Sequence, residues 1–398
     1  MTVLQKLIDK GDYLAAGLMS GTSMDGVDAA IVRLPDDLEN DVIELIGFYS
    51  VPYPKELRDV LRNLSFGEEC KAEDIATLGT SVAVAFAHSF HAACREARVD
   101  SVSVDFIGSH GQTVAHVPPG AEGIAITGTL QLGPPGTIAA LTGVTTVGDF
   151  RVTDMGLGGQ GAPLAPYPDF LMRRSKSRDR VILNIGGIAN VTYLPKNAAP
   201  SEVIAFDAGP GNMVTDELYR VLFPKEVGYD NLVAHIREGT PSESIIDRFM
   251  EHAYFKQKPP KSAGHREFGP GFSWDFHRRS EEAGLKRADT LISSVLLTAE
   301  VIERAIRDHI GPNAGVDEVF VTGGGSHNAV LMEALEQRLT PTTVQSIIEL
   351  GIPADAKEAV DFAVLARETI RGRPNVIHSV TGATRPAVLG TIAMGNVT

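Results

Sequence analysis

The stretch LAAGLMSGTSMDGVDAAIVRL, residues 14–34, decides the fold. An apolar run, Leu14–Met19, is interrupted by the polar segment SGTSMDGVD at 20–28, and a second apolar run, Ala29–Leu34, follows at once. Two apolar runs joined by a short turn rich in Gly, Ser and Asp are typical of a β-hairpin. The sequence therefore predicts two paired strands with a polar turn between them.

The residues of this turn suit an anionic ligand. Gly21 and Gly26 permit backbone conformations that present N–H groups to an anion, and Thr22 and Ser23 can donate hydrogen bonds to phosphate oxygens. The carboxylate of Asp25 could hold Mg²⁺ through water. Because ordinary turns favour the same residues, a plain polar hairpin turn remains the alternative.

The composition excludes several classes of protein. At 398 residues, with 43% apolar and 22% charged residues, the chain is globular, and two domains are expected. A net charge of −14 argues against nucleic acid and against an anionic membrane surface as partners, because both bind basic patches.

The sequence also favours a cytoplasmic location. It contains only two cysteines and no CxxC motif, which fits a reducing compartment. The N-terminal segment MTVLQKLIDKGDY has neither the apolar core nor the cleavage site of a signal peptide. No apolar run approaches the ~18–20 residues of a membrane span.

Beyond the hairpin, strands and helices alternate, and each half of the chain opens with a β-meander. This pattern indicates an α/β fold with a weak internal duplication. The further strands are expected at 42–51, 104–108, 144–147, 181–184, 189–194, 203–206 and 318–321, and 388–394 is a strand or helix. The helices are expected at 57–64, 70–97, 137–141, 213–222, 229–257, 289–308, 328–338 and 356–369, and loops at 117–135 and 256–271.

A glycine-rich segment marks the expected domain boundary. Residues 154–164, DMGLGGQGAPL, contain four glycines in eleven positions, too many for regular structure. We therefore predict an N-terminal α/β domain at 1–150, to which 375–398 return, and a C-terminal α/β domain at 151–374.

Four Gly- and Asp-rich turns follow predicted strands, at 20–28, 154–163, 207–212 and 322–328. Ligands of α/β folds bind at such turns, beyond the carboxyl ends of strands. None of the turns matches the P-loop pattern GxxxxGK[ST], and GxGxxG, HExxH and GxSxG are also absent. His110 and His116 lie in one loop but lack further ligands, so a hydrogen-bonded role is favoured over metal binding.

Three charged residues are candidates for chemistry, each with a structural alternative. Asp207 follows an apolar strand and could act as a general base, or it could cap the turn and the next helix. Glu358 near the start of a helix reads, by composition alone, as a favourable first-turn acid. Arg151 is the best counter-charge for an anionic substrate, or it pairs with Asp149 or Asp154.

Taken together, these turns resemble one family, the 1,6-anhydro-N-acetylmuramic acid kinases. The matching blocks are in order and extend from residue 14 to about 394. They are SGTSMDGVDAAIV (20–32), SHGQTVAH (109–116), VGDFR with DMGLGGQGAPL (147–164), NIGGIANVTYL (184–194), FDAGPGNM (206–213), VTGGGSHN (321–328) and SVTGA (379–383).

The resemblance implies both a fold and an activity. The fold is that of the actin-like ATPase and sugar kinase superfamily: two α/β domains with mixed sheets and a cleft between them. The activity is that of a phosphotransferase with an alcohol group as acceptor. It uses ATP, Mg²⁺ and water to open the 1,6-anhydro ring and phosphorylate the 6-oxygen, giving MurNAc 6-phosphate and ADP in peptidoglycan recycling.

The resemblance also assigns roles. Asp207 would be the base that deprotonates water, and Glu358 would help to position that water. His110 and Arg151 would bind the sugar or its lactyl carboxylate. The nucleotide would be bound by Gly21, Thr22, Ser23, Met24, Asp25, Gly26, Val27 and Asp28 and by Gly323, Gly324, Gly325 and Asn328, with Mg²⁺ arriving on the nucleotide. A homodimer is the assembly considered.

Two segments depart from the family pattern. The family's YDxDGxxA-like segment reads YDNLVA at 229–234, and its PKSTGRE-like segment reads PKSAGHRE at 260–267, with an extra His265. Both are expected to lie away from the residues of the chemistry. Levoglucosan kinase, a relative that opens the same bridge on another sugar, and a non-catalytic sugar-sensing protein remain alternatives, although GGQG at 158–161 fits the anhydroMurNAc type.

Overall fold

The computed structural model describes residues 2–65, 67, 69–119, 127–226, 229–310 and 315–396. The chain forms two compact units: unit 1 comprises Met1–Arg173 and Gly351–Thr398, and unit 2 comprises Arg174–Leu350. This division differs from the predicted domains, 1–150 with 375–398 and 151–374, at both junctions. The glycine-rich segment 154–164 therefore lies inside unit 1 and is not a boundary.

Buried charges explain why helices α6 (Pro166–Arg173) and α14 (Ala354–Ile370) belong to the same unit. Arg173 lies 2.8 Å from Asp169 and 2.9 Å from Asp361, while Lys357 lies 3.0 Å and 2.7 Å from the same two carboxylates. All four side chains are at most 3% exposed. Two cations and two anions thus balance one another, and breaking such a buried network is costly.

The central sheet of unit 1 is built around the predicted hairpin, which is confirmed. Strands β1 and β2 pair antiparallel with Met19 opposite Asp28, and β3 continues the meander. On the other side, β4 and β7 are parallel to β1, and β13 closes the order β13-β7-β4-β1-β2-β3. The strands are β1 (Tyr13–Met19), β2 (Gly26–Leu34), β3 (Glu44–Pro52), β4 (Phe106–Ser109), β7 (Thr146–Gly148) and β13 (Thr391–Ala393), and β5 (Gln112–Val117) pairs with β6 (Gly128–Leu132) in a small second sheet.

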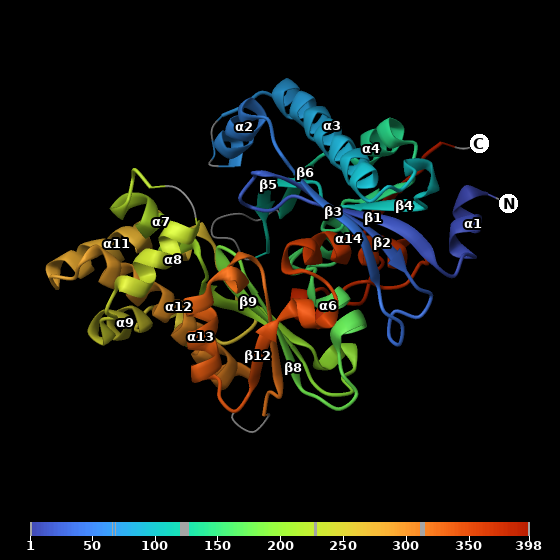
Figure 1. Ribbon diagram of the computed structural model, residues 1–398. Coiled ribbons are helices and arrows are strands. Elements are labelled where there is room, and N and C mark those ends of the chain that lie inside the picture. Colours follow the sequence, from blue (N-terminus) through green and yellow to red (C-terminus); the bar gives the residue numbers. More distant parts are fainter. Residues whose placement is uncertain are drawn as a thin grey trace. The chain divides into compact units, whose positions relative to one another are not determined.

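Helices cover both faces of this sheet, as Figure 1 shows for α3 and α14. Along β1, side chains alternate between the two faces: Ala15 and Met19 join the core on the α14 side, and Ala16 and Leu18 join the core on the α3 side. The helices of this unit are α1 (Val3–Ile8), α2 (Lys55–Ser65), α3 (Ala72–Glu96), α4 (Pro135–Thr142), α5 (Val152–Gly156), α6, α14 and α15 (His378–Thr381).

Two glycines let α14 approach the sheet closely. Gly17 of β1 and Gly108 of β4 are register neighbours. A Cβ atom on Gly17 would lie 1.7 Å from the Ala359 carbonyl oxygen, and one on Gly108 would lie 2.0 Å from that of Phe362. No side chain fits at either position, so the helix backbone rests directly on the strands.

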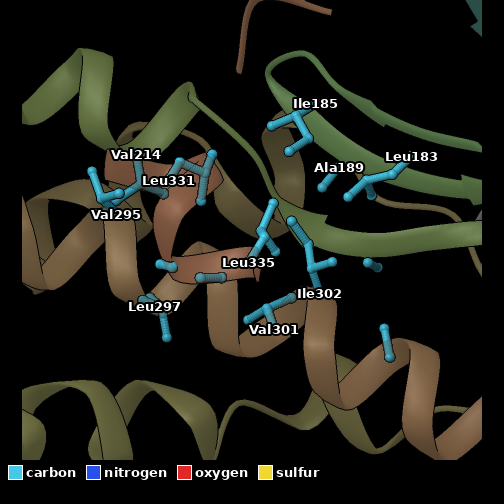
Figure 2. Close-up of a cluster of buried hydrophobic side chains, with 14 of the residues drawn as sticks. Leu183, Ile185, Ala189, Val214, Val295, Leu297, Val301, Ile302, Leu331 and Leu335 are labelled. Atoms are coloured by element: carbon cyan, nitrogen blue, oxygen red, sulfur yellow. The ribbon is translucent and has the colours of Figure 1, made fainter. Parts of the chain in front are cut away.

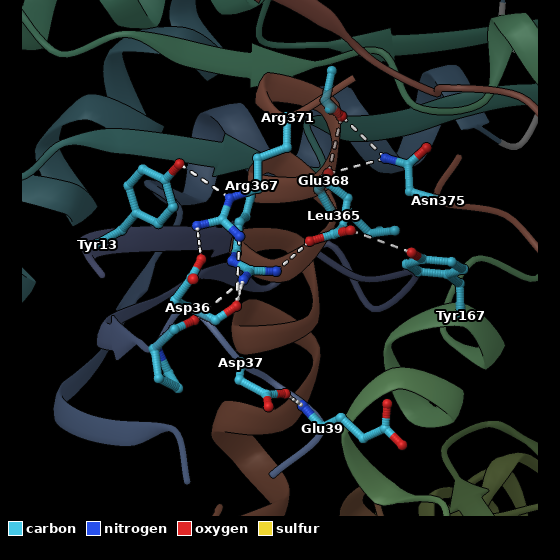
Figure 3. Close-up of polar contacts among 12 residues, drawn as sticks. Tyr13, Asp36, Asp37, Glu39, Tyr167, Leu365, Arg367, Glu368, Arg371 and Asn375 are labelled. Carbon is cyan, nitrogen blue, oxygen red and sulfur yellow. Dashed lines mark hydrogen bonds and ion pairs between the residues drawn. The ribbon is translucent and has the colours of Figure 1, made fainter. Parts of the chain in front are cut away.

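The C-terminal half of α14 is held by a polar network (Figure 3). Arg367, only 1% exposed, contacts Glu368 and the carbonyl oxygen of Asp36. Glu368 also accepts a 3.4 Å hydrogen bond from the hydroxyl of Tyr167 on α6, and Arg371 donates to the Tyr13 hydroxyl at 3.2 Å. These contacts tie the helix to the start of β1 and to the loop after β2.

Unit 2 repeats the same strand arrangement. Its sheet has the order β10-β9-β8-β11-β12, with β8, β9 and β10 antiparallel and β8, β11 and β12 parallel. This corresponds to β3-β2-β1-β4-β7 of unit 1, so the predicted duplication is confirmed. The strands are β8 (Arg180–Ile185), β9 (Ile188–Leu194), β10 (Ile204–Pro210), β11 (Glu318–Thr322) and β12 (Thr343–Ser346).

The core of unit 2 lies between this sheet and helices α7, α12 and α13. Leu183 and Ile185 of β8 pack with Val301 and Ile302 of α12 and with Leu335 of α13 (Figure 2). The helices are α7 (Met213–Leu222), α8 (Tyr229–Glu238), α9 (Glu243–Met250), α10 (His265–Phe268), α11 (Pro270–Glu282), α12 (Arg287–Ile310) and α13 (Ala329–Arg338).

The expected fold class, two α/β domains with mixed sheets, is confirmed, but several local expectations are wrong. The loop expected at 117–135 includes β6, although residues 120–126 of it lie outside the described residues. The irregular segment 154–164 begins within α5, and the loop expected at 256–271 contains α10 and runs into α11. In the described part of the chain, none of the helices has the length and apolarity needed to cross a membrane.

Candidate active site

In unit 1, the hairpin turn is held by a buried amide. The Ser20 hydroxyl lies 2.6 Å from the Gly26 carbonyl oxygen and 2.7 Å from Oε1 of Gln112. Nε2 of Gln112, which is 1% exposed, donates to the Gly21 carbonyl at 3.2 Å. Gln112 is the first residue of β5 and comes shortly after β4, which pairs with β1. It therefore holds the turn from the end of the strand next to β1.

The turn presents some of its predicted residues to solvent and buries others. Thr22, Ser23 and Asp25 are exposed, and the Ser23 hydroxyl donates to Asp25 at 2.8 Å. Met24 (φ 52°) and Val27 direct their side chains into the core, so only their backbone could face a phosphate. The exposed side chains of Thr22, Ser23 and Asp25 thus form the polar crest of the turn.

Asp28 and Gly26 lie at the start of β2. Burial raises the pKa of Asp28, the Ser50 hydroxyl opposes this shift, and the charges of Asp25 and Asp355 add to it. A Cβ on Gly26 would lie 2.3 Å from the Val51 carbonyl oxygen, so this glycine is required by close packing of β3.

Arg151 and His110 are brought together. His110 Nδ1 lies 2.9 Å from the Ser20 carbonyl, which can only accept, so Nδ1 carries the proton and Nε2 accepts from Arg151 at 2.8 Å. Burial and the charge of Arg151 lower the pKa of His110 to about 3, so the imidazole is neutral. His116 is likewise hydrogen-bonded, to Thr129 at 3.1 Å.

Among the described residues, the guanidinium of Arg151 forms hydrogen bonds with neutral groups only. Its second hydrogen bond goes to the Gly161 carbonyl at 2.8 Å, and its solvent-shielded Nε has no partner in the described part of the chain. Among the described residues no carboxylate forms an ion pair with it, so the alternatives of a bridge to Asp149 or Asp154 are not observed. Asp154 instead accepts from the Gly161 N–H and the Thr381 hydroxyl, both at 2.7 Å.

Glu358 lies in the second turn of α14, so the interpretation as a first-turn acid is wrong; Asp355 has that position. The side chain of Glu358 is exposed to solvent. The pKa of Glu358 is raised, first because surrounding protein atoms displace part of its hydration, and further by Asp361 and Asp28, while Lys357 and Arg151 oppose the shift. Electrostatics thus link Glu358 to Arg151 and to the hairpin.

In unit 2, Asp207 lies at a β-bulge. The pairing of β10 with β9 shifts register between Asp207 and Gly209. A bulge bends its strand and redirects side chains, and bulges are frequent beside active sites. The carboxylate accepts the Ala263 N–H at 2.8 Å and does not cap the next helix, whose N-cap is Asn212.

The segment PKSAGHRE at 260–267 was expected to lie away from the candidate catalytic residues, but it contacts Asp207. The Asp207 N–H donates to the Lys261 carbonyl at 3.1 Å, and the Tyr254 hydroxyl donates to the Asp207 carbonyl at 2.8 Å. Burial raises the pKa of Asp207 to about 6, although the Ala263 N–H and the charge of Lys261 lower it. The expectation failed because 207 and 261 are far apart in sequence and only the tertiary fold joins them.

A cavity of about 330 Å³ in unit 2 contains part of the predicted nucleotide site. Gly324 and Asn328 line it, Gly323 precedes it with φ 76°, and Gly325 is buried against Ile185. Asn328 also caps α13, since its Oδ1 accepts from two backbone N–H groups at 3.1 and 3.2 Å. The cavity is lined by Asn212, Thr215, Asp216, Leu232, Gly324, His327 and Asn328.

Sequence reasoning missed several of these residues. Gln112 and Asn212 stand within the matched blocks SHGQTVAH and FDAGPGNM, so a signal was present for both. Thr215 and Asp216 project from the helix after Asn212 and carried no signal. In the described ranges, no group of three or more His, Cys, Asp or Glu side chains is arranged to hold a metal ion. Gly228, which precedes the departing segment at 229–234, and the side chains of Tyr229 and Asp230 within it lie outside the described residues.

Comparison with known proteins decides the family. The family model for anhydro-N-acetylmuramic acid kinase matches residues 13–395. The chain belongs to the anhydro-N-acetylmuramic acid kinase family. It is 40% identical over 396 residues to the anhydro-N-acetylmuramic acid kinase of Salinibacter ruber, covering 99% of each chain. The enzyme of that name from Caldanaerobacter subterraneus is 37% identical, with 99% and 100% coverage, and that from Bacillus cereus is 38% identical, with 95% and 98%.

The chain also shows a distant similarity to a solved sugar kinase structure. A ROK family glucokinase from Streptomyces griseus in complex with glucose and AMPPNP aligns with 89% of the chain at 11% identity and a TM-score of 0.39. Membership of the kinase family rests on the sequence matches.

Proposed function

We propose that this chain is an ATP-dependent kinase that opens the 1,6-anhydro ring of anhydro-N-acetylmuramic acid and phosphorylates its 6-oxygen. The products are MurNAc 6-phosphate and ADP, in a step of cell-wall recycling. The observation that carries the proposal is the Asp207 carboxylate on its β-bulge, held by the Ala263 N–H, in a chain that the family model matches from 13 to 395. Burial raises the pKa of this carboxyl group to about 6. A group with this pKa is ionised at neutral pH and is still a useful base.

The reaction is balanced with Mg-ATP and water as co-substrates. A water oxygen forms a bond to the anomeric carbon as the bond from that carbon to the 6-oxygen breaks, and Asp207 takes the water proton. The 6-oxygen then bonds to the γ-phosphorus, and the bond from that phosphorus to the β,γ-bridging oxygen breaks, releasing ADP. Positioning and charge neutralisation contribute most to such transfers.

The roles of the other residues follow from their chemistry. The polar crest of the hairpin turn, formed by Thr22, Ser23 and Asp25, would contact the phosphate oxygens. The cavity at Asn212 and Asn328 would bind the adenosine. Arg151, a guanidinium without a carboxylate partner among the described residues, would bind the lactyl carboxylate of the sugar. Neutral His110 would fix the orientation of Arg151, and Glu358 would orient the attacking water.

The test is ADP release from Mg-ATP with anhydroMurNAc, with levoglucosan and without sugar. We expect rapid release with anhydroMurNAc, release that is at least ~100-fold slower with levoglucosan and none without sugar, and a sugar phosphate as the product. Reactions in ¹⁸O-labelled water should leave the transferred phosphate unlabelled, because its ester oxygen comes from the sugar.

Other outcomes would redirect the proposal. Turnover of levoglucosan at an equal or higher rate would move the chain to levoglucosan kinase activity. Sugar-independent release of labelled inorganic phosphate would indicate an ATPase, and no ADP release with either sugar would favour a sugar-sensing protein.

A further inference from the structure

Lys261 is a buried cation that the proposed reaction does not use. Its side chain is only 8% exposed, and its ammonium lies over the rings of Tyr254 at 4.7 Å and Phe206 at 5.8 Å from the centroids. Within the described residues it forms no ion pair and no side-chain hydrogen bond. Cation–π contacts offset only part of the cost of removing such a charge from water.

The position of Lys261 is set by the segment that clamps Asp207. The Lys261 carbonyl accepts the Asp207 N–H at 3.1 Å, and two residues later the Ala263 N–H binds the Asp207 carboxylate at 2.8 Å. Tyr254, the main ring under the ammonium, itself donates to the Asp207 carbonyl. The charge is thus fixed to the same backbone elements as the carboxylate.

We propose that Lys261 is a positioning residue for Asp207: its enclosed ammonium supplies the positive charge that keeps this carboxylate ionised and ready to accept a proton. The inference rests on the proposed function in that Asp207 is taken as the base. It assigns a task to a segment, PKSAGHRE, for which the resemblance gave none.

The charges around the pair support this assignment. The charge of Lys261 lowers the pKa of Asp207, and the charge of Glu267 of α10 raises it. Lys261 is faced by Arg304 and Asp308 of α12, and His309 packs on Phe206 from the same helix. Burial lowers the pKa of Lys261 to about 8 and Asp207 counters that shift, so between about pH 6 and 8 both groups are charged.

The test removes the charge and follows Asp207 directly. In protein labelled with ¹³C at aspartate side chains, the Asp207 signal is identified by its loss in Asp207→Asn and titrated by NMR. We expect its midpoint to rise by about one pH unit in Lys261→Met, the size of effect that a nearby opposite charge exerts. Lys261→Arg should restore the wild-type midpoint, and Lys256→Met, which removes an exposed lysine paired with Glu251 at 2.8 Å, should leave it unchanged.

The activity profile gives a second readout. The acid limb of kcat/KM for anhydroMurNAc should move upward with the NMR midpoint in Lys261→Met, and Lys261→Gln serves if the Met variant does not fold. An unchanged midpoint in the neutral variants would overturn the role of Lys261. If wild-type protein shows no sugar-dependent ADP release, the proposed function fails, and the NMR titration still decides the charge relation.

Discussion

Several local features together determine the environment of Asp207. The bulge in β10 redirects the Asp207 side chain. The Lys261 carbonyl accepts the Asp207 N–H, and the Ala263 N–H donates to the Asp207 carboxylate. Burial raises the pKa of Asp207 to about 6. No single residue in this arrangement is unusual. A carboxylate with this environment is charged near neutrality but still basic enough to take a proton from an attacking water.

We expect Asp207→Asn to lower kcat by ~100- to 10,000-fold, the usual cost of removing a general base. The amide is isosteric and can still accept the Ala263 N–H, so the fold should persist. Nucleotide affinity, measured by calorimetry with Mg-ADP, should stay close to wild type, because Asp207 does not line the cavity at Asn212 and Asn328. A variant that keeps more than roughly a tenth of the wild-type rate would remove Asp207 from this role.

Arg151→Ala tests substrate choice. A charge-assisted hydrogen bond contributes roughly 1.5–3 kcal/mol, which corresponds to about a 10- to 150-fold change. We therefore expect kcat/KM for anhydroMurNAc to fall by that factor, and the low activity on levoglucosan, which has no carboxylate, to change little.

His110→Gln is the companion variant of Arg151→Ala, since an amide oxygen can still accept from the Arg151 guanidinium while the imidazole ring is gone. It should lose less activity on anhydroMurNAc than Arg151→Ala.

Equal losses on both sugars in Arg151→Ala would mean that Arg151 contacts the ring that both sugars share or supports the fold, and its role in substrate specificity would be refuted.

At the scale of elements, the long periodic segments were predictable and the short ones were not. In the hairpin, α3, α7, α12 and α13, the spacing of the apolar residues indicates the type of secondary structure without knowledge of any other part of the chain. Strand β12 and helix α6 are short, and their identity depends on neighbours that lie far away in sequence. For α6 the deciding contact is the buried quartet of Asp169, Arg173, Lys357 and Asp361, which no local pattern reveals.

The contact between α14 and the sheet gives a prediction about stability. Gly17→Ala places a methyl group 1.7 Å from the Ala359 carbonyl oxygen, and backbone cannot yield as a side-chain end can. We expect a loss of about 3 kcal/mol or more in the free energy of unfolding, at or beyond the upper end for overpacked cores, measured by urea denaturation. Gly136→Ala is the matched control, since its Cβ would meet nothing within 4 Å and it lies in helix α4.

The control should be stabilised by about 0.4–1 kcal/mol, because alanine loses less chain entropy than glycine on folding. If Gly17→Ala matched the control, α14 would not rest on β1 as described.

At the scale of the whole molecule, the sequence predicted the class of fold and the repeated strand order, but not the division of the chain. The repeated strand order follows from two similar runs of strands, which the pattern of apolar segments already indicates. The boundary prediction relied on glycine content at 154–164. Two of those glycines serve close packing instead: a Cβ on Gly159 would lie 2.3 Å from the Asp154 carboxylate, and one on Gly161 2.7 Å from Met155, whereas a Cβ on Gly156 or Gly158 would meet nothing within 4 Å. Glycine content alone cannot separate a linker from a tightly packed turn.

The division of the chain into two units leads to a last prediction, about unit 2 expressed without unit 1. Unit 2 is one continuous stretch, Arg174–Leu350, and every buried residue of its core cluster lies between Val181 and Val344. A domain with its own core can fold alone. We expect residues 174–350, expressed alone, to unfold in one cooperative transition by circular dichroism, and to bind adenosine nucleotides more weakly than the full chain.

The same fragment should release no sugar-dependent ADP, because Arg151, Glu358 and the hairpin turn all belong to unit 1. The residues that line its cavity, among them Asn212, Thr215 and Asn328, all belong to the fragment. If the proposed function is right and the turn at 21–28 contacts the further phosphates, binding of AMP should be weakened less than binding of ATP. Asn212→Ala in the fragment is the control that should abolish the remaining binding. A fragment that folds but loses AMP binding altogether would show that the adenosine site needs residues of unit 1, and one without a cooperative transition would refute the independence of its core.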